Sequence, residues 1–291
     1  MIGYRITHIT TYTYTEPVSL CQNVARLIPR DCGTQSCERS SLTIEPQPAV
    51  MDQTLDIFGN PVTYFSIQEP HRSLRIEATH DVTLTARFTP EASRTMAWDS
   101  LGDWMRQTRT GDTILASQFL FDSRYVQAAP EYAEYARVPF SPGRPVLEAC
   151  FDLTQRIFTD FAYDPRATTV ATPTREVFRT RRGVCQDFAH FQLGCLRSLG
   201  VPARYISGYL STVPAAGKPR LVGVDASHAW ISVYCGPDGW VDLDPTNNQY
   251  LSDRHIVLAW GRDYDDVSPV KGVILGGGQH KVAVSVDARA G

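Results

Sequence analysis

Alternation of apolar and polar residues dominates the first part of the chain. The stretches YRITHITTYTYT, residues 4–15, and LRIEATHDVTLTARF, residues 74–88, change character at nearly every second position and are rich in β-branched and aromatic residues. A repeat of two residues is the period of a β-strand with one buried face. Several such strands separated by turn residues predict a small β-sandwich within residues 1–93.

After residue 93 the apolar residues return at helical spacing. Between residues 145 and 160 they form one stripe, which comprises Leu147, Phe151, Leu153, Ile157 and Phe158. A second helix is predicted from Cys185 to Leu199, because Gly200 and the following Val-Pro pair end the helical pattern.

Strand patterns follow this second helix at residues 203–210, 228–235 and 240–244. One helix followed by an antiparallel sheet predicts an α+β fold. We therefore expect an N-terminal β-rich domain at residues 1–93, an α+β core at residues 94–262, and a C-terminal segment at residues 263–291. The final strand of that segment is expected to pack on one of the two sheets.

Bulk composition narrows the range of partners. Of the 291 residues 43% are hydrophobic, enough for sizeable cores, and the formal net charge is −3. This balance gives no reason to expect a nucleic acid or a membrane as partner. No segment has the roughly 18 consecutive apolar residues of a membrane span. The N-terminal residues lack the pattern of a signal peptide, so we expect a cytoplasmic location.

The cysteines raise the question of whether one of them is a disulfide partner, a metal ligand or a nucleophile. There are seven, with no CxxC pair, which argues against a disulfide framework and a zinc ribbon. Cys185 stands at the front of the second predicted helix, where the helix dipole and free N–H groups favour a thiolate and can hold an oxyanion. Since a buried cysteine is more often a packing residue, a nucleophile here needs a histidine to support it.

The segment HAWISVYCGPDGWVDLD supplies a histidine. Its two strands are joined by a short turn, and pairing Tyr234 with Trp240 sets the register of a hairpin. Alternation then places His228 on the same face as Asp242 and Asp244. A carboxylate diagonal to the histidine can fix the tautomer of the imidazole and leave its other nitrogen for a thiol. Parity alone does not separate Asp242 from Asp244.

With these residues in place, the chain resembles the transglutaminase-like superfamily. The blocks that carry the resemblance are GVCQDFAH around Cys185, SHAWISVY around His228 and GWVDLDPTNN around Asp244, and residues 4–15, LDIFGNPV and PHRSLRIEA resemble the N-terminal region of its bacterial branch. The resemblance implies a papain-like cysteine-protease core with a Cys185–His228–Asp244 triad, since the acid precedes Pro-Thr. It also implies an aromatic oxyanion donor upstream of the cysteine, for which Tyr163 is the candidate.

The expected activity is acyl transfer at an amide bond of a peptide or protein. With water as acceptor the protein is a cysteine peptidase or amidase, and with an amine it is a protein-glutamine transglutaminase. A third reading is a non-catalytic peptide- or protein-binding module on the same fold. The substrate and the oligomeric state remain open.

No cofactor and no metal are expected. Asp187 and His190 lie close to Cys185 in the sequence, and we interpret them as structural because no further ligands stand at zinc spacing. The stretch GRDYDD, with Asp263, Asp265 and Asp266, lacks the ligand pattern of a calcium loop and is expected to be a solvated loop.

Overall fold

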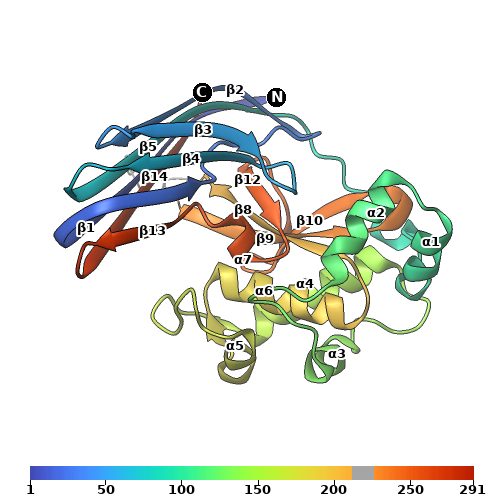
Figure 1. The fold of residues 1–291 in the computed structure, drawn as a ribbon. Helices are drawn as coiled ribbons and strands as arrows, with labels where there is room; N and C mark the ends of the chain where they lie inside the picture. Colours follow the sequence, from blue (N-terminus) through green and yellow to red (C-terminus); the bar gives the residue numbers. More distant parts are fainter. Residues whose placement is uncertain (212–225) are drawn as a thin grey trace, which may run out of the picture.

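The computed structural model describes residues 1–211 and 226–291 and contains two large sheets. The first has seven strands in the order β2-β5-β1-β4-β3, with β13 and β14 also paired to β1 (Figure 1). Their bounds are β1 Ile2–Ala25, β2 Gln35–Glu45, β3 Val50–Leu55, β4 Pro61–Ile67, β5 His71–Leu84, β13 Val270–Gly276 and β14 His280–Ala290.

The 24-residue strand β1 organises this sheet. One side of its first half pairs with β5 and the other with β14, whereas its second half pairs with β4 and β13. Buried side chains from β1, β2, β4 and β5 form one core, which includes Val18, Phe65 and Ile76. The alternating N-terminal sequence therefore folds into β-structure with its own core.

The second sheet has five strands in the order β11-β10-β9-β8-β12. Their bounds are β8 Ala203–Leu210, β9 Ala226–Tyr234, β10 Trp240–Asp244, β11 Gln249–Tyr250 and β12 His255–Gly261. Trp240 pairs with Tyr234, so the predicted register of the β9–β10 hairpin is confirmed. Ile231, Val233 and Leu243 point into the main core, as alternation predicts.

Helices cover one face of the second sheet (Figure 1). The α-helices are α1 Leu101–Gln107, α2 Gly111–Ser117, α3 Pro130–Ala136, α4 Val146–Asp160, α5 Thr174–Thr180, α6 Cys185–Ser198 and α7 Tyr264–Val267. The 3-10 turns are η1 Ala92–Arg94, η2 Trp98–Ser100, η3 Gln118–Leu120 and η4 Gly236–Asp238. Two short strands, β6 Ala162–Tyr163 and β7 Arg182–Gly183, pair in parallel.

The two predicted helices are found as α4 and α6. In α4 the side chains of Leu147, Leu153 and Ile157 are fully buried, but Phe158 is 47% exposed and does not belong to the inward stripe. The expectation for Phe158 was wrong because it directly follows Ile157, and the next residue on a helix is turned by about 100° from the buried face. No helix among the described residues is both long and apolar enough to cross a membrane.

Candidate active site

The N-terminus of α6 is built to present Cys185. The carboxylate of Asp187 folds back and accepts hydrogen bonds from the backbone N–H of Val184 at 2.8 Å and from the hydroxyl of Thr168 at 2.6 Å. This is the returning half of a capping box. Gly183 makes room for that carboxylate, because a Cβ at position 183 would lie 2.5 Å from Asp187 Oδ2. Cys185 is thereby the first residue of the helix.

The other cysteines in this part of the fold have a different environment. Burial raises the pKa of Cys150 and Cys195 far above the ordinary value, and it raises the pKa of Cys235 to about 12. All three thiols are buried in the main core. Cys185 is instead half-buried and lines a cavity of about 620 Å³.

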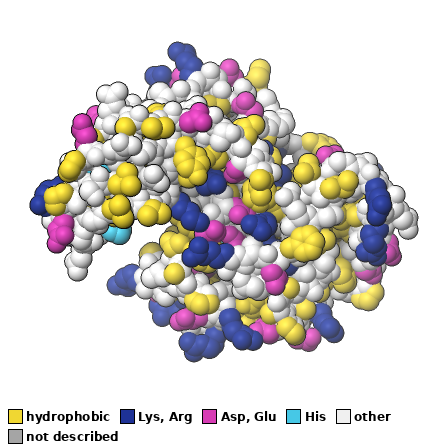
Figure 2. Space-filling view, in the orientation of Figure 1, with side chains coloured by type: hydrophobic (Ala, Val, Ile, Leu, Met, Phe, Trp, Pro, Cys, Tyr) yellow, Lys and Arg dark blue, Asp and Glu magenta, His cyan; other side chains and the backbone are white. Residues whose placement is uncertain are grey.

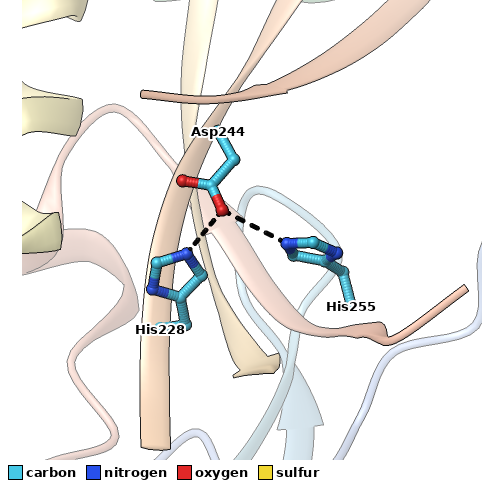
Figure 3. A group of neighbouring side chains, drawn as sticks. All are labelled: His228, Asp244 and His255. Carbon is cyan, nitrogen blue, oxygen red and sulfur yellow. Dashed lines mark hydrogen bonds and ion pairs between the residues drawn. The ribbon is translucent and has the colours of Figure 1, made fainter. Parts of the chain in front are cut away.

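His228 in β9 and Asp244 at the end of β10 form a direct pair (Figure 3). His228 Nε2 lies 2.8 Å from Asp244 Oδ2, and Asp244 is fully buried. Because Nε2 faces the carboxylate, Nδ1 is left for the Cys185 side chain. Burial alone would lower the pKa of His228, but hydrogen bonding to Asp244 and to Cys185 raises it to about 10.

Asp244 accepts several further hydrogen bonds. Its Oδ1 accepts the backbone N–H groups of Thr246 at 2.9 Å and Asn247 at 3.2 Å, and its Oδ2 accepts the side-chain amide of Asn247 at 2.6 Å. Burial works to raise the pKa of Asp244, yet hydrogen bonds from His228, His255 and the Asn247 side chain hold it well below its usual value. The carboxylate therefore stays ionised.

His255, the first residue of β12, is a partner of Asp244 that the sequence did not indicate. Its Nε2 lies 3.3 Å from Asp244 Oδ2, the same oxygen that His228 contacts (Figure 3). Its Nδ1 accepts the backbone N–H of Ser252 at 3.2 Å, which places the proton on Nε2 and makes His255 a donor to Asp244. No motif marks His255, which comes eleven residues after Asp244 in the chain. Asn247 lies inside the GWVDLDPTNN block, but it received no role in the sequence analysis.

His228, Asp244 and His255 are also a set of side chains that could ligate a metal, with their ligand atoms within 4.8 Å of one another. The hydrogen bonding does not fit that role. A metal on His255 Nε2 would require the proton on Nδ1, where it would face the Ser252 N–H. The arrangement is that of a carboxylate holding two imidazoles by hydrogen bonds.

The cavity at Cys185 lies between the two sheets. The second sheet and α6 contribute Cys185, Ser207 and His228, while the first sheet contributes its β1 and β14 strands. The β14 wall is apolar and consists of Val282, Val284 and Val286. The N-terminal region and the C-terminal strand thus shape the space in front of the thiol.

The two other residues considered from the sequence have clear positions. Tyr163 pairs with Gly183 through β6 and β7, is 59% exposed, and has its pKa raised by partial burial and by the neighbouring Cys185. Its part in binding an oxyanion stays a prediction. Asp242 lies away from His228 and pairs with Arg87, with 3.3 Å between Oδ2 and Nη1.

The acidic and histidine side chains outside the pair have structural contacts. His190 is buried and accepts the backbone N–H of Tyr264 at 3.2 Å. Asp263 is only 1% exposed and accepts backbone N–H groups of Tyr125 and Asp265, so its expected place in a solvated loop was wrong. Asp263 is the N-cap residue of the short helix α7. This role was missed in the sequence analysis because GRDYDD was treated as one solvated loop.

Comparisons with known proteins agree with this architecture. A family model described as the bacterial transglutaminase-like N-terminal region matches residues 4–83, and the transglutaminase-like superfamily model matches residues 136–245. A crystal structure of a candidate cysteine protease from Cytophaga hutchinsonii superposes with a TM-score of 0.75 at 20% identity, covering 99% of this chain and 90% of that one. The fold is therefore α+β, with a papain-like core next to an N-terminal β-sheet region.

The sequence relatives give the family. An uncharacterised protein of Mycobacterium bovis is 40% identical over 98% of this chain and 91% of its own length, and one of Mycobacterium leprae is 32% identical over 97% of both. A protein-glutamine gamma-glutamyltransferase of Pseudomonas aeruginosa is 31% identical over 102 residues, which are 32% of this chain and 15% of that protein. The chain belongs to the transglutaminase-like superfamily, and this resemblance is confirmed.

Proposed function

We propose that this protein is a thiol acyl-transfer enzyme that cleaves amide bonds of peptides or proteins, a cysteine peptidase or amidase with Cys185, His228 and Asp244 as its catalytic residues. The observation that carries the proposal is the buried His228–Asp244 pair, whose imidazole also interacts with the half-buried thiol at the start of α6. A thiol, a base and an orienting acid are the parts that a nucleophilic triad needs.

In this proposal the Cys185 thiolate attacks the carbonyl carbon of the amide and forms a C–S bond. The backbone N–H of Cys185 and the phenol of Tyr163 donate hydrogen bonds to the oxyanion. His228 then gives its proton to the amine as the C–N bond breaks, leaving a thioester. Water, deprotonated by His228, attacks the thioester and releases the acid and the thiol. Asp244 keeps the imidazole oriented throughout.

The acyl acceptor separates the two enzymatic alternatives. The Pseudomonas aeruginosa relative is named for transfer to an amine, and its match spans a third of this chain, which keeps a protein-glutamine transglutaminase as the second candidate. Incubation with a glutamine-containing peptide and a fluorescent primary amine distinguishes them. Hydrolysis of an amide bond without incorporation of the amine supports the peptidase or amidase, whereas incorporation supports the transglutaminase.

The decisive experiment measures the reactivity of each cysteine with iodoacetamide by mass spectrometry between pH 5 and pH 9. Cys37 is a matched internal control, because it is also half-buried, while burial and nearby acids raise its pKa to about 11. We expect Cys185 to react at least tenfold faster than Cys37 below pH 7, and His228→Ala to abolish that advantage.

Equal rates for Cys185 and Cys37, unchanged in His228→Ala, would contradict the proposed catalytic pair. Binding of a peptide or protein without turnover would then favour the non-catalytic module. Asp244→Asn provides a second variant that keeps the shape of the side chain, and we expect it to lower kcat by a factor on the order of 10³–10⁴, as the loss of tautomer control does in other triads. The cytoplasmic location stays a prediction and needs fractionation of cells.

A further inference from the structure

A second cavity, of about 660 Å³, lies apart from the one at Cys185 and shares no lining residue with it. Its walls come from three parts of the fold: the loops around residues 30–34 and 57–59, the α2–η3 segment, and strands β8, β10 and β12. In the space-filling view, basic and hydrophobic side chains gather along the boundary between the first sheet and the helical part (Figure 2).

Three arginines line this cavity, and one of them is matched by an acid. Arg87 donates to Asp242 at 3.3 Å and to the carbonyl oxygen of His255 at 2.8 Å. Asp112, the other acidic residue in the lining, is exposed and makes no ion pair with any described residue. Arg87 is therefore the arginine whose charge the protein itself balances by direct contact.

Arg30 and Arg204 have no such partner. Arg30 is only 8% exposed, and its Nη1 donates to the neutral oxygens of Phe58 and Asn60. Arg204 makes no hydrogen bond or ion pair within residues 1–211 and 226–291, and Asp242 acts on it only through charge. The Nε atoms of both arginines are buried without an acceptor among the described residues. Buried guanidinium groups in this state are costly unless something accepts from them.

Both guanidinium groups pack against tryptophan indole rings. Arg30 Cζ lies 3.0 Å and Arg204 Cζ 3.7 Å from the ring centre of Trp260, and Arg204 Cζ lies 4.3 Å from that of Trp240. Cation–π contact orients the groups but accepts no N–H. Burial and, after it, the nearby Arg204 charge lower the pKa of Arg30 to about 10, although Cys32 and Asp56 act in the opposite direction.

We propose that this cavity binds a small organic anion, with a carboxylate or phosphate head on Arg204 and Arg30 and an apolar body against Phe58, Phe119 and Trp240. Guanidinium groups pair with both kinds of head through parallel N–H···O bonds. The larger part of the lining surface is apolar and suits an apolar body. This site is independent of the proposed catalytic function.

Isothermal titration calorimetry with four probes tests the proposal. Benzoate and phenyl phosphate carry the two acidic heads on an apolar ring, inorganic phosphate lacks the ring, and benzyl alcohol lacks the charge. We expect benzoate or phenyl phosphate to bind more tightly than inorganic phosphate, and benzyl alcohol to bind least. The better of the two aromatic anions identifies the head group.

The matched variants are Arg204→Met, which removes the guanidinium, and Arg137→Met, which removes an arginine that directly follows α3 and is 71% exposed. Arg204→Met should weaken the aromatic anion at least tenfold, whereas Arg137→Met should leave its Kd unchanged. Arg204→Lys keeps a positive charge but not the planar guanidinium group, and its Kd for the aromatic anion should lie between those of Arg204→Met and Arg137→Met.

Two results overturn the proposal: no measurable binding of either aromatic anion to the wild-type protein at 10 mM, or equal affinity in wild type and Arg204→Met. Thermal unfolding of each variant verifies that it is folded, and Arg204→Lys carries the test if Arg204→Met does not fold. Cys185 alkylation in the same samples reports separately on the catalytic pair. Failure of the anion-site proposal therefore does not affect the proposed Cys185–His228 pair, and failure of the pair does not affect the anion-site proposal.

Discussion

At the scale of single residues, Asp244 is the centre of the site. A fully buried carboxylate is costly unless its oxygens are satisfied, and here two backbone N–H groups, one amide and two imidazoles satisfy them. Parity along the β9–β10 hairpin placed His228 on one face with Asp242 and Asp244, and the family resemblance selected Asp244. The same reasoning could not find His255, because a loop of irregular backbone separates it from Asp244 and hides its position from any periodic pattern.

His255 is expected to act as a positioning residue for His228, through Asp244. His255→Leu removes one donor from Asp244, and we expect kcat for amide hydrolysis to fall about ten- to hundredfold. With one donor fewer, the Asp244 carboxylate stabilises the protonated form of His228 more strongly and raises the pKa of His228. The basic limb of the pH–rate profile should therefore move to higher pH. His255→Gln, which retains an N–H donor, should recover most of the rate. If both variants keep the wild-type pH profile, His255 has only a packing role.

At the scale of elements, the turn into α6 determines where the thiol lies. Gly183, the backbone N–H of Val184 and the carboxylate of Asp187 form a compact unit just before and inside the helix. The GVCQD letters predicted a helix that begins at Cys185, and this is observed. What the letters did not reveal is that Gly183 is needed for space, since the Asp187 side chain occupies the position a Cβ would take.

Gly183→Ala tests this unit. The added methyl group would press on the Asp187 carboxylate and its Cβ at 2.5–2.8 Å, so Asp187 must leave the Val184 N–H. We expect a loss of about 1 kcal/mol in the free energy of unfolding, typical of a lost helix cap, and slower alkylation of Cys185. Urea denaturation and the iodoacetamide rate measure the two effects. Gly111→Ala, with open space around it, is the control and should change neither.

The strand and helix predictions succeeded where one face of an element is buried against one core. They were less complete at the edge of a helical stripe, as for Phe158 in α4, and where a side chain caps a helix, as for Asp263 before α7. Long-range pairing was the hardest part: alternation in residues 280–290 predicts a strand but contains no information about its neighbour. Its neighbour is β1, and the domain limits expected from the sequence stay predictions.

At the scale of the whole molecule, the first sheet forms one wall of the proposed catalytic cleft. Three valines of β14 face the cavity that contains Cys185 and His228. For the proposed enzyme, we expect this apolar wall to give a preference for substrates with apolar side chains beside the scissile amide. The first sheet therefore contributes to the cleft itself, through β14 and through His8, Thr10 and Tyr12 of β1.

Val284→Lys places a charge on this wall without disturbing the core, because Val284 is 56% exposed. We expect kcat/KM for apolar peptides to fall about tenfold, mainly through KM, since the lost apolar contact contributes on the order of 1–3 kcal/mol. Val273→Lys changes a valine of β13 that is 71% exposed and does not line the cavity, and it should leave kcat/KM unchanged. Equal kinetics for the two variants would exclude the β14 wall from substrate binding.

Buried histidines make the stability of the molecule depend on pH. Burial, assisted by His80 in the case of His8, lowers the pKa of His8 and of His80 to about 4, and burial lowers the pKa of His190 to about 3. Below pH 6.5 these histidines are protonated in the unfolded chain but stay neutral in the folded protein. The free energy of unfolding that is present above pH 6.5 therefore decreases as the pH falls towards 4.

Each histidine contributes a slope of up to about 1.4 kcal/mol per pH unit in this window. Urea denaturation of wild type and His8→Gln between pH 7 and pH 4.5 measures the effect. Glutamine can keep contacts with Tyr209 and Thr10, which lie 2.8 Å and 2.9 Å from the His8 ring nitrogens, but it does not titrate. The variant should show a shallower loss of stability with acid, and an identical slope would contradict the assignment of His8.

The pairing of β1 with β13 and β14 has a consequence for synthesis of the chain. Tyr4 pairs with Ala290 and Ala25 with Val270. One edge of β1 therefore stays unpaired until residues 270–290 have left the ribosome. Until then β1 presents open N–H and C=O groups, which are a template for pairing with other chains. A nascent chain stalled before residue 270 would therefore be the species most in need of a chaperone.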